Sequence, residues 1–230
     1  MKAIIFDLDE TLISHRRQIE NFIDYQYNYF YKTLKNIPFE EWKQKFIDLD
    51  NNGYVTKDIV YRSLVDTYNL EISHEQLYEH FLNNFHYYIS PLQGANELLF
   101  TIRDRNLKLG LLTNGGRIIQ ENKIKMLKYE NIFYEIVISE SVGYEKPDPK
   151  IFNIMLEKLD VEAKDCLFVG DHAINDIKGA KALGFRTIWM SQDRDWEIET
   201  YCPDWIATSL SEVQGIIINE VEKSENIKIY

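Results

Sequence analysis

The chain has 230 residues, of which 45% are hydrophobic, so it can bury a substantial core as one large domain or as a core with a smaller insert. Its 26 Lys and Arg against 37 Asp and Glu give a formal net charge of −11, which argues against a nucleic-acid polymer as a partner. Two cysteines make no disulfide framework. No signal peptide and no apolar run of the roughly 18 residues that a membrane helix needs is recognisable. We therefore expect a globular cytoplasmic protein that does not enter a membrane.

Short apolar runs along the chain are typical of buried β-strands, and they lie at residues 2–8, 107–113, 134–139, 166–170 and 185–190. The later four alternate with helical patterns, which predicts βαβ units and a parallel sheet. Run 2–8 is almost entirely apolar, as in strands covered by helices on both faces, so we place it at the centre of the sheet. The predicted fold class is α/β, with a doubly wound parallel sheet.

Between the first two strand runs the pattern becomes helical. Ile19, Phe22 and Ile23 recur at helical spacing, and Ser73 with Gln76 forms a predicted capping box. Further along, Asp148 and Pro149 predict the start of another helix. We expect a helical insert at residues 15–89 within an α/β core formed by residues 1–14 and 90–230.

The stretch DLDNNGYVTKDI at residues 48–59 resembles a calcium-binding loop, with Asp48, Asp50 and Asn52 at the first, third and fifth positions. The twelfth position, which must supply a bidentate carboxylate, is Ile59. We therefore favour a turn at 51–53, followed by a helix that begins near Lys57 and buries Ile59, Val60 and Leu64.

Aromatic residues are dense in the insert, and this density has two readings. They could stack on a substrate base, but helical spacing favours packing inside the insert itself. The residues concerned are Tyr25, Tyr27, Tyr29, Phe30 and Tyr31.

Two carboxylates lie at the end of the first predicted strand. Alternation along a strand points Asp7 and Asp9 the same way, and two like charges in one site require a shared proton or a cation. In an open α/β sheet, ligands bind at the carboxyl ends of the strands. This edge is therefore the candidate site.

Other strands bring polar groups to the same edge. Thr113 and Asn114 close the second strand, Asp171 closes the fourth, Asp176 follows five residues later, and Lys146 lies in the loop after the third. Hard oxygen ligands of this kind suit Mg²⁺, which commonly shares a substrate phosphate. Together these side chains predict a site that binds magnesium and a phosphate group.

The four segments DLDET (7–11), LLTNG (111–115), Lys146 of EKPDP and GDHAIND (170–176) resemble the four ordered motifs of the haloacid dehalogenase superfamily. The insert resembles the helical cap of that family. Residues 111–152 resemble the branch with pyrimidine nucleotidases and N-acylneuraminate-9-phosphatases. The resemblance implies a Rossmann-like core with an inserted cap domain.

The resemblance also implies roles. Asp7 would be the nucleophile that forms an aspartyl phosphate, and Asp9 the general acid and base. Asp7, the main-chain carbonyl of Asp9 and Asp171 would hold Mg²⁺, with Asp176 a less direct ligand. The phosphoryl oxygens would be bound by three further residues, Thr113, Asn114 and Lys146.

Asp9 favours phosphate chemistry over dehalogenation, because the dehalogenases of the family lack this carboxylate. The predicted function is a magnesium-dependent phosphatase acting on a small phosphorylated metabolite, a nucleotide or a sugar phosphate. A phosphomutase and a non-catalytic phosphometabolite-binding module are the alternatives. We expect a monomer or a weak homo-oligomer.

Overall fold

The computed structural model describes residues 1–53, 55–105 and 107–226, with the side chains of residues 52 and 224–226 not included. The chain divides into two compact units. The first, here the α/β unit, comprises residues 1–13 and 91–230, and the second, the helical unit, comprises residues 14–90. Their roles as catalytic core and cap stay predictions.

The α/β unit is built on a parallel sheet of six strands in the order β3-β2-β1-β4-β5-β6. The strands are β1 (Ala3–Phe6), β2 (Lys108–Thr113), β3 (Glu135–Ile138), β4 (Cys166–Gly170), β5 (Arg186–Met190) and β6 (Trp205–Ala207). All five predicted strands are present, β1 is central as expected, and β6 is an addition. The predicted doubly wound parallel sheet is confirmed.

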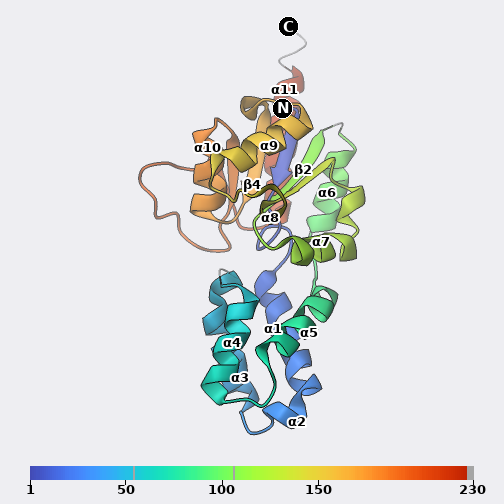
Figure 1. Cartoon of the computed structure of the whole chain (residues 1–230). Coiled ribbons are helices and arrows are strands. Elements are labelled where there is room, and N and C mark those ends of the chain that lie inside the picture. The colour runs from blue at the N-terminus through green and yellow to red at the C-terminus, as the bar shows by residue number, and fades with distance from the viewer. Residues whose placement is uncertain (54, 106, 227–230) are drawn as a thin grey trace. The chain divides into compact units, whose positions relative to one another are not determined.

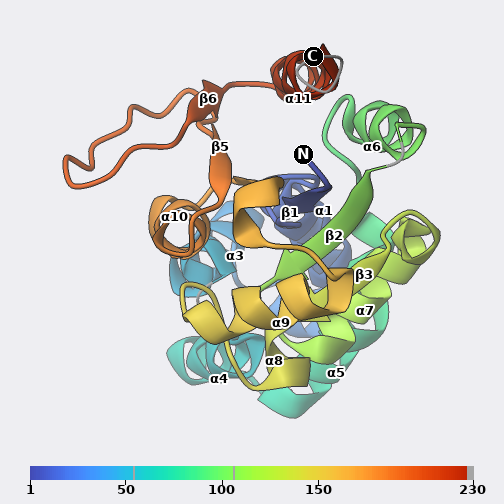
Figure 2. The same cartoon turned by 90° about the horizontal axis from the view of Figure 1, so that it is seen from above.

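Helices cover both faces of this sheet. Figure 2 shows α6 (Ala95–Arg103) and α11 (Leu210–Asn226) over one face, and α9 (Pro149–Leu159) and α10 (Gly179–Ala182) over the other. The remaining α-helices of the unit are α7 (Arg117–Met126) and α8 (Ser139–Val142), both labelled in Figure 1. Among the described residues, none of the helices combines the length and the apolar character needed to cross a bilayer.

The core of the α/β unit explains why β1 reads as a continuous apolar run. All four of its residues are buried, because the strand has neighbours on both edges and helices on both faces. Ile5 packs in a cluster with Phe152 and Met155 of α9 and Phe168 of β4. Asp148 caps α9 through the Lys150 amide, 2.9 Å from its Oδ1, as the sequence predicts.

The helical unit contains five α-helices among its described residues: α1 (His15–Tyr29), α2 (Tyr31–Leu34), α3 (Phe39–Asp50), α4 (Lys57–Tyr68) and α5 (His74–Asn84). The predicted capping box at Ser73 and Gln76 is present at the start of α5. Phe22 of α1 meets Phe81 of α5 edge to face, with ring centroids 5.3 Å apart. The unit therefore has its own aromatic core.

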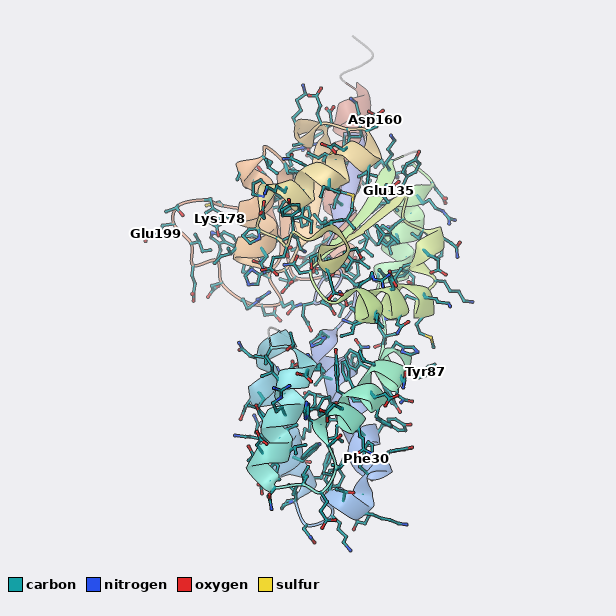
Figure 3. The ribbon with its side chains drawn as sticks, viewed as in Figure 1. Phe30, Tyr87, Glu135, Asp160, Lys178 and Glu199 are labelled. Atoms are coloured by element: carbon teal, nitrogen blue, oxygen red, sulfur yellow. The ribbon has the colours of Figure 1, made fainter. Side chains whose placement is uncertain are left out.

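The aromatic residues predicted to pack inside the insert divide into two groups. Tyr27 is buried, and its hydroxyl donates to the Ile37 carbonyl at 2.6 Å. Tyr29 is exposed, although its ring lies against that of His80. Figure 3 shows where Phe30 lies in the helical unit, at the junction between α1 and α2.

The segment that resembles a calcium loop forms a turn, as expected. Asn51–Gly53 is a short 3₁₀ turn, and the Gly53 amide donates to Asp50 Oδ2 at 2.8 Å. Lys57, the first residue of α4, forms an ion pair with Asp50. The side chain of Asn52, the fifth position of the loop pattern, lies outside the described residues.

One prediction for this segment is wrong. Ile59 is 53% exposed rather than buried. The buried face of α4 consists of Lys57, Val60, Tyr61 and Leu64, which follow the helical spacing of three and four residues. Ile59 directly precedes Val60, and adjacent helical residues face different directions, so Ile59 points to solvent.

Candidate functional site

The predicted site residues come from the carboxyl ends of three adjacent strands, from the loop after α8 and, for Asp176, from the helical segment Ala173–Lys178. Asp7 and Asp9 follow the central strand β1, Thr113 ends β2, and Asp171 follows β4. Because the strands are parallel and hydrogen-bonded neighbours in the order β2-β1-β4, these ends share one edge of the sheet. The fold therefore gathers residues that are far apart in sequence.

Lys146 is the centre of this edge. Its Nζ lies 2.6 Å from Asp7 Oδ1 and 2.7 Å from Asp176 Oδ1, so one ammonium bridges two carboxylates. The Lys146 side chain is only 3% exposed. A lysine is buried to this degree only where it is paired, and both partners here are predicted site residues.

A third carboxylate, that of Asp171, lies close to the two that Lys146 bridges. Asp7, Asp171 and Asp176 each offer an oxygen, and the three oxygens lie within 4.8 Å of one another. Asp176 is held in place by the His172 amide, which donates to its Oδ2 at 2.9 Å. A Cβ at Gly170 would collide with the Asp176 side chain, so the close approach requires glycine there.

Burial raises the proton affinity of two of these carboxylates, Asp7 and Asp171. Burial raises the pKa of Asp7 to about 7, and the charges of Asp176 and Asp9 act in the same direction against that of Lys146. Burial, followed by the charges of Asp176 and Asp7, holds the pKa of Asp171 well above its usual value. The ionised cluster is thus short of positive charge, and a hard cation bound to these oxygens would relieve the deficit.

The pKa of Lys146 is raised as well, but for a different reason. Burial alone would lower the pKa of the ammonium, but the charges of Asp176 and Asp7 outweigh it, so the pKa lies above its usual value. Lys146 therefore stays charged at neutral pH. It is a fixed positive charge beside the carboxylate of Asp7.

Thr113 and Asn114 lie at the same edge, but in different environments. The Thr113 hydroxyl is buried, donates to the Asn114 carbonyl at 3.2 Å and accepts from the side chain of Gln120 at 2.7 Å. The Asn114 side chain donates to the Lys146 carbonyl at 2.9 Å and accepts from the Lys146 amide at 2.8 Å. Asn114 therefore ties the loop that carries Lys146 to the end of β2.

Asp9 has partners that the sequence did not indicate. Its Oδ1 lies 2.6 Å from Lys123 Nζ, and its Oδ2 accepts from Gln120 Nε2 at 2.8 Å. Both partners are on α7, 111 and 114 residues further along the chain. Gln and Lys on a helix are ordinarily read as solvated, and only their spacing of three residues on one face hints at a shared task.

Residues 191–204, which connect β5 and β6, also contact the site edge. Arg194 NH2 lies 3.3 Å from Asp171 Oδ2 and donates to the Asp171 carbonyl at 3.1 Å. The side-chain Nε2 of Gln192 donates to the Glu10 carbonyl at 2.6 Å. Figure 3 shows Glu199 in the part of this loop that extends away from the sheet.

Comparisons with known proteins show which family the chain belongs to. The family model of haloacid dehalogenase-like hydrolases matches residues 4–190. The chain is 28% identical over 240 residues to the glyceraldehyde 3-phosphate phosphatase of Pyrococcus abyssi, covering 100% of this chain and 98% of that protein. It is 30% identical over 221 residues to the pyrimidine 5′-nucleotidase YjjG of Escherichia coli, covering 93% of this chain and 96% of that one.

A solved structure supports the fold. The putative HAD-hydrolase YfnB of Bacillus subtilis, whose structure is described as bound to magnesium, matches with a TM-score of 0.75 and 23% identity, covering 94% of this chain and 97% of that one. The predicted Rossmann-like core and the predicted hydrolase class are confirmed. The chain belongs to the haloacid dehalogenase-like hydrolases.

Proposed function

We propose that this protein is a magnesium-dependent phosphatase that hydrolyses a small phosphomonoester through an aspartyl-phosphate intermediate. The observation that carries the proposal is the buried Asp7 carboxylate, which lies at the end of the central strand against the Lys146 ammonium, 2.6 Å away. Relatives named as phosphatases and nucleotidases, over nearly the whole chain, support the same reaction class.

The residues at the site fit a magnesium ion. Asp7, Asp171 and Asp176 supply carboxylate oxygens close enough to share one cation, and Asp9 would add its main-chain carbonyl. An all-oxygen donor set suits a hard divalent ion rather than zinc. When bound, the ion would offset the negative charge shared by the carboxylates and an incoming phosphate.

Two chemical steps follow from the assigned roles. The Asp7 carboxylate attacks phosphorus, the bond from phosphorus to the ester oxygen breaks, and Asp9 gives its proton to the departing alcohol oxygen. Asp9 then takes a proton from a water molecule, whose oxygen attacks the same phosphorus and releases inorganic phosphate from Asp7. The sum is one phosphomonoester and one water converted to one alcohol and one phosphate.

Lys146 and Thr113 are assigned to the phosphoryl oxygens. Lys146 carries a fixed charge beside the nucleophile, and the Thr113 hydroxyl lies at the same strand edge. Phosphoryl transfer depends mostly on positioning and electrostatics, and these two groups supply both. Asn114 contributes by holding the Lys146 main chain through two hydrogen bonds.

The substrate class is a small phosphorylated metabolite, a nucleotide or a sugar phosphate, with the helical unit as the cap that selects it. A cytoplasmic location and a monomeric or weakly associating chain belong to the same proposal. A phosphomutase acting on the same residues remains the rival, because it would use the same aspartyl phosphate. It differs by returning the phosphoryl group to the substrate without net release of phosphate.

The test is phosphate release from nucleoside monophosphates, sugar phosphates and p-nitrophenyl phosphate, with magnesium and with chelator. We expect release that requires magnesium. Acid quenching during turnover of ³²P-labelled substrate should leave label on the protein, and hydroxylamine, which cleaves acyl phosphates, should remove it. Folded protein that releases no phosphate from any substrate would contradict the proposal, and isomerised substrate would identify a mutase.

A further inference from the structure

Helix α7 carries two polar residues that the roles assigned so far do not use. Gln120 and Lys123 are each only 2% exposed, although the helix also has a solvent-exposed face. They are three residues apart, so they lie on the same face of α7. Burying a lysine and a glutamine is costly unless each has a partner, which suggests that their contacts serve a purpose.

Both residues contact the carboxylate of Asp9. Lys123 Nζ lies 2.6 Å from Oδ1, and Gln120 Nε2 lies 2.8 Å from Oδ2, so each oxygen has its own donor. The Asp9 side chain is still 28% exposed. The carboxylate is therefore held from one side by α7 while part of it stays accessible.

Gln120 also connects Asp9 to the phosphate-binding end of β2. The same Nε2 lies 2.7 Å from Thr113 Oγ1, so one amide spans two groups assigned to the reaction. Gly115 makes this approach possible. Its φ is +140°, and a Cβ there would lie 3.2 Å from Gln120 Cδ, tighter than an ordinary packing contact.

We propose that Gln120 and Lys123 are positioning residues that fix the orientation of the Asp9 carboxylate for proton transfer to the leaving group. The inference rests on the proposed phosphatase function and adds two residues to it. Proton transfer in the first step requires the carboxyl group to lie within hydrogen-bond reach of the ester oxygen. A carboxylate held at both oxygens has little freedom to rotate out of that position, and such pre-organisation supports catalysis.

The role predicts a dependence on the leaving group. p-Nitrophenolate is a stable anion and departs without a proton, whereas an alkoxide needs one. Disturbing Asp9 should therefore reduce kcat/KM for an alkyl phosphate much more than kcat/KM for p-nitrophenyl phosphate. A merely structural role of α7 would reduce the two values together.

The variants are Lys123→Met, which removes the ammonium, and Gln120→Glu, which keeps the shape but places a negative charge against Asp9. Lys125→Met is the matched control, because Lys125 lies on the same helix, is exposed and loses the same charge. The two substrates are p-nitrophenyl phosphate and the best nucleoside monophosphate of the panel. We expect the ratio of alkyl to aryl kcat/KM to fall about 30-fold in each test variant and to stay within about twofold in the control.

The Lys123→Met substitution is also made in Asp9→Asn protein, to test whether its effect depends on the Asp9 carboxylate. In Asp9→Asn protein the ratio is already low, and adding Lys123→Met should lower it further by less than about threefold. An equal loss for both substrates in Lys123→Met and Gln120→Glu, or a full effect of Lys123→Met in the Asp9→Asn background, would overturn the inference. Wild-type protein that hydrolyses neither substrate would overturn the proposed function itself, so the two failures are distinguishable.

Discussion

The chain contains the triplet Asp-Leu-Asp twice. In each copy one aspartate is buried, but the pKa of this aspartate is raised in the first copy and lowered in the second. In the α/β unit, the copy at residues 7–9 places Asp7 in a cluster with Asp171 and Asp176, and the Lys146 ammonium bridges Asp7 and Asp176. In the helical unit, the copy at residues 48–50 places Asp50 against Lys57, with His15 Nε2 3.5 Å away. Each cluster is a buried carboxylate facing a buried lysine.

The difference lies in the balance of charge. Burial pushes the pKa of Asp50 upward, but the hydrogen bond from His15 and the charge of Lys57 outweigh burial, so this pKa lies below its usual value. The pKa of Asp7 is raised instead, to about 7. A buried carboxylate whose charge is matched by nearby positive charge can serve the fold alone. Where negative charge is in excess, the cluster requires a further cation or a proton. The balance of charge, and not the triplet itself, therefore distinguishes the Asp50–Lys57 pair, here the structural cluster, from the candidate site around Asp7.

The largest expected difference between the two triplets is in turnover, and neutralising the first aspartate of each triplet tests it. Asp7→Asn should lower phosphatase kcat by on the order of 10⁴-fold, because an amide cannot act as the nucleophile. Asp48→Asn is the matched control, since Asp48 is exposed and accepts a hydrogen bond from Gln44 of the same helix. Steady-state kinetics on p-nitrophenyl phosphate measures both.

The loss of turnover in Asp7→Asn should not come from a loss of stability. Asp7→Asn removes one of the repelling carboxylates, so the melting temperature in chelator should stay equal to that of the wild type or rise. Turnover of Asp7→Asn at more than a tenth of the wild-type rate would remove Asp7 from the role of nucleophile. A similar loss of turnover in Asp48→Asn would show that the two triplets are not functionally distinct.

A third variant, Asp50→Asn, tests how much the buried Asp50–Lys57 pair contributes to stability. Asp50→Asn leaves the Lys57 ammonium, 7% exposed, without its carboxylate, and should cost about 3 kcal/mol of unfolding free energy. Asp58→Asn is the control, because Asp58 pairs with Arg62 on the surface of the same helix and should cost no more than about 0.5 kcal/mol. Urea denaturation followed by circular dichroism gives both values, and equal values would contradict a structural role for the buried pair.

The two clusters should also respond to pH with opposite signs. The unfolded pKa of Asp7 is near 3.8 and the folded one about 7, so its contribution to stability is fully present below pH 3.8 and is lost as pH rises through 7. The lowered pKa of Asp50 makes its contribution present above pH 3.8 and lost as the pH falls below that value.

Magnesium isolates the Asp7 contribution, because only ionised carboxylates hold the ion. Saturating magnesium should raise the melting temperature at pH 8 by at least about 3 °C more than at pH 5, which corresponds to about 1 kcal/mol. Asp7→Asn should lose most of this difference, while Asp48→Asn should keep it. Differential scanning calorimetry measures the effect, and a shift that is equal at both pH values would contradict the charge deficit at the site.

The sequence predicted most of the fold because its signal is local. Buried strands read as apolar runs, and all but the last strand of the sheet were predicted from them. The missing strand, β6, consists of the three residues Trp205–Ala207, an apolar run that is too short to be recognised as a strand. That the candidate site residues lie close together was predictable, because parallel topology brings strand ends together. Gln120 and Lys123 were not, because their partner Asp9 is more than a hundred residues away and only the tertiary fold supplies it.

The smallest expected effect is that of completing the calcium-loop pattern that begins at the second triplet. Ile59 occupies the position where such a loop needs a carboxylate, and its side chain is exposed, so Ile59→Glu should change unfolding free energy by less than about 0.5 kcal/mol. The variant completes the sequence pattern of the loop. We nevertheless expect isothermal titration with calcium to give no binding at submillimolar concentration, because Asp50 is already engaged by Lys57 and by the Gly53 amide. Micromolar binding by Ile59→Glu would show that the missing twelfth ligand, and not the buried ion pair, is what separates this turn from a calcium site.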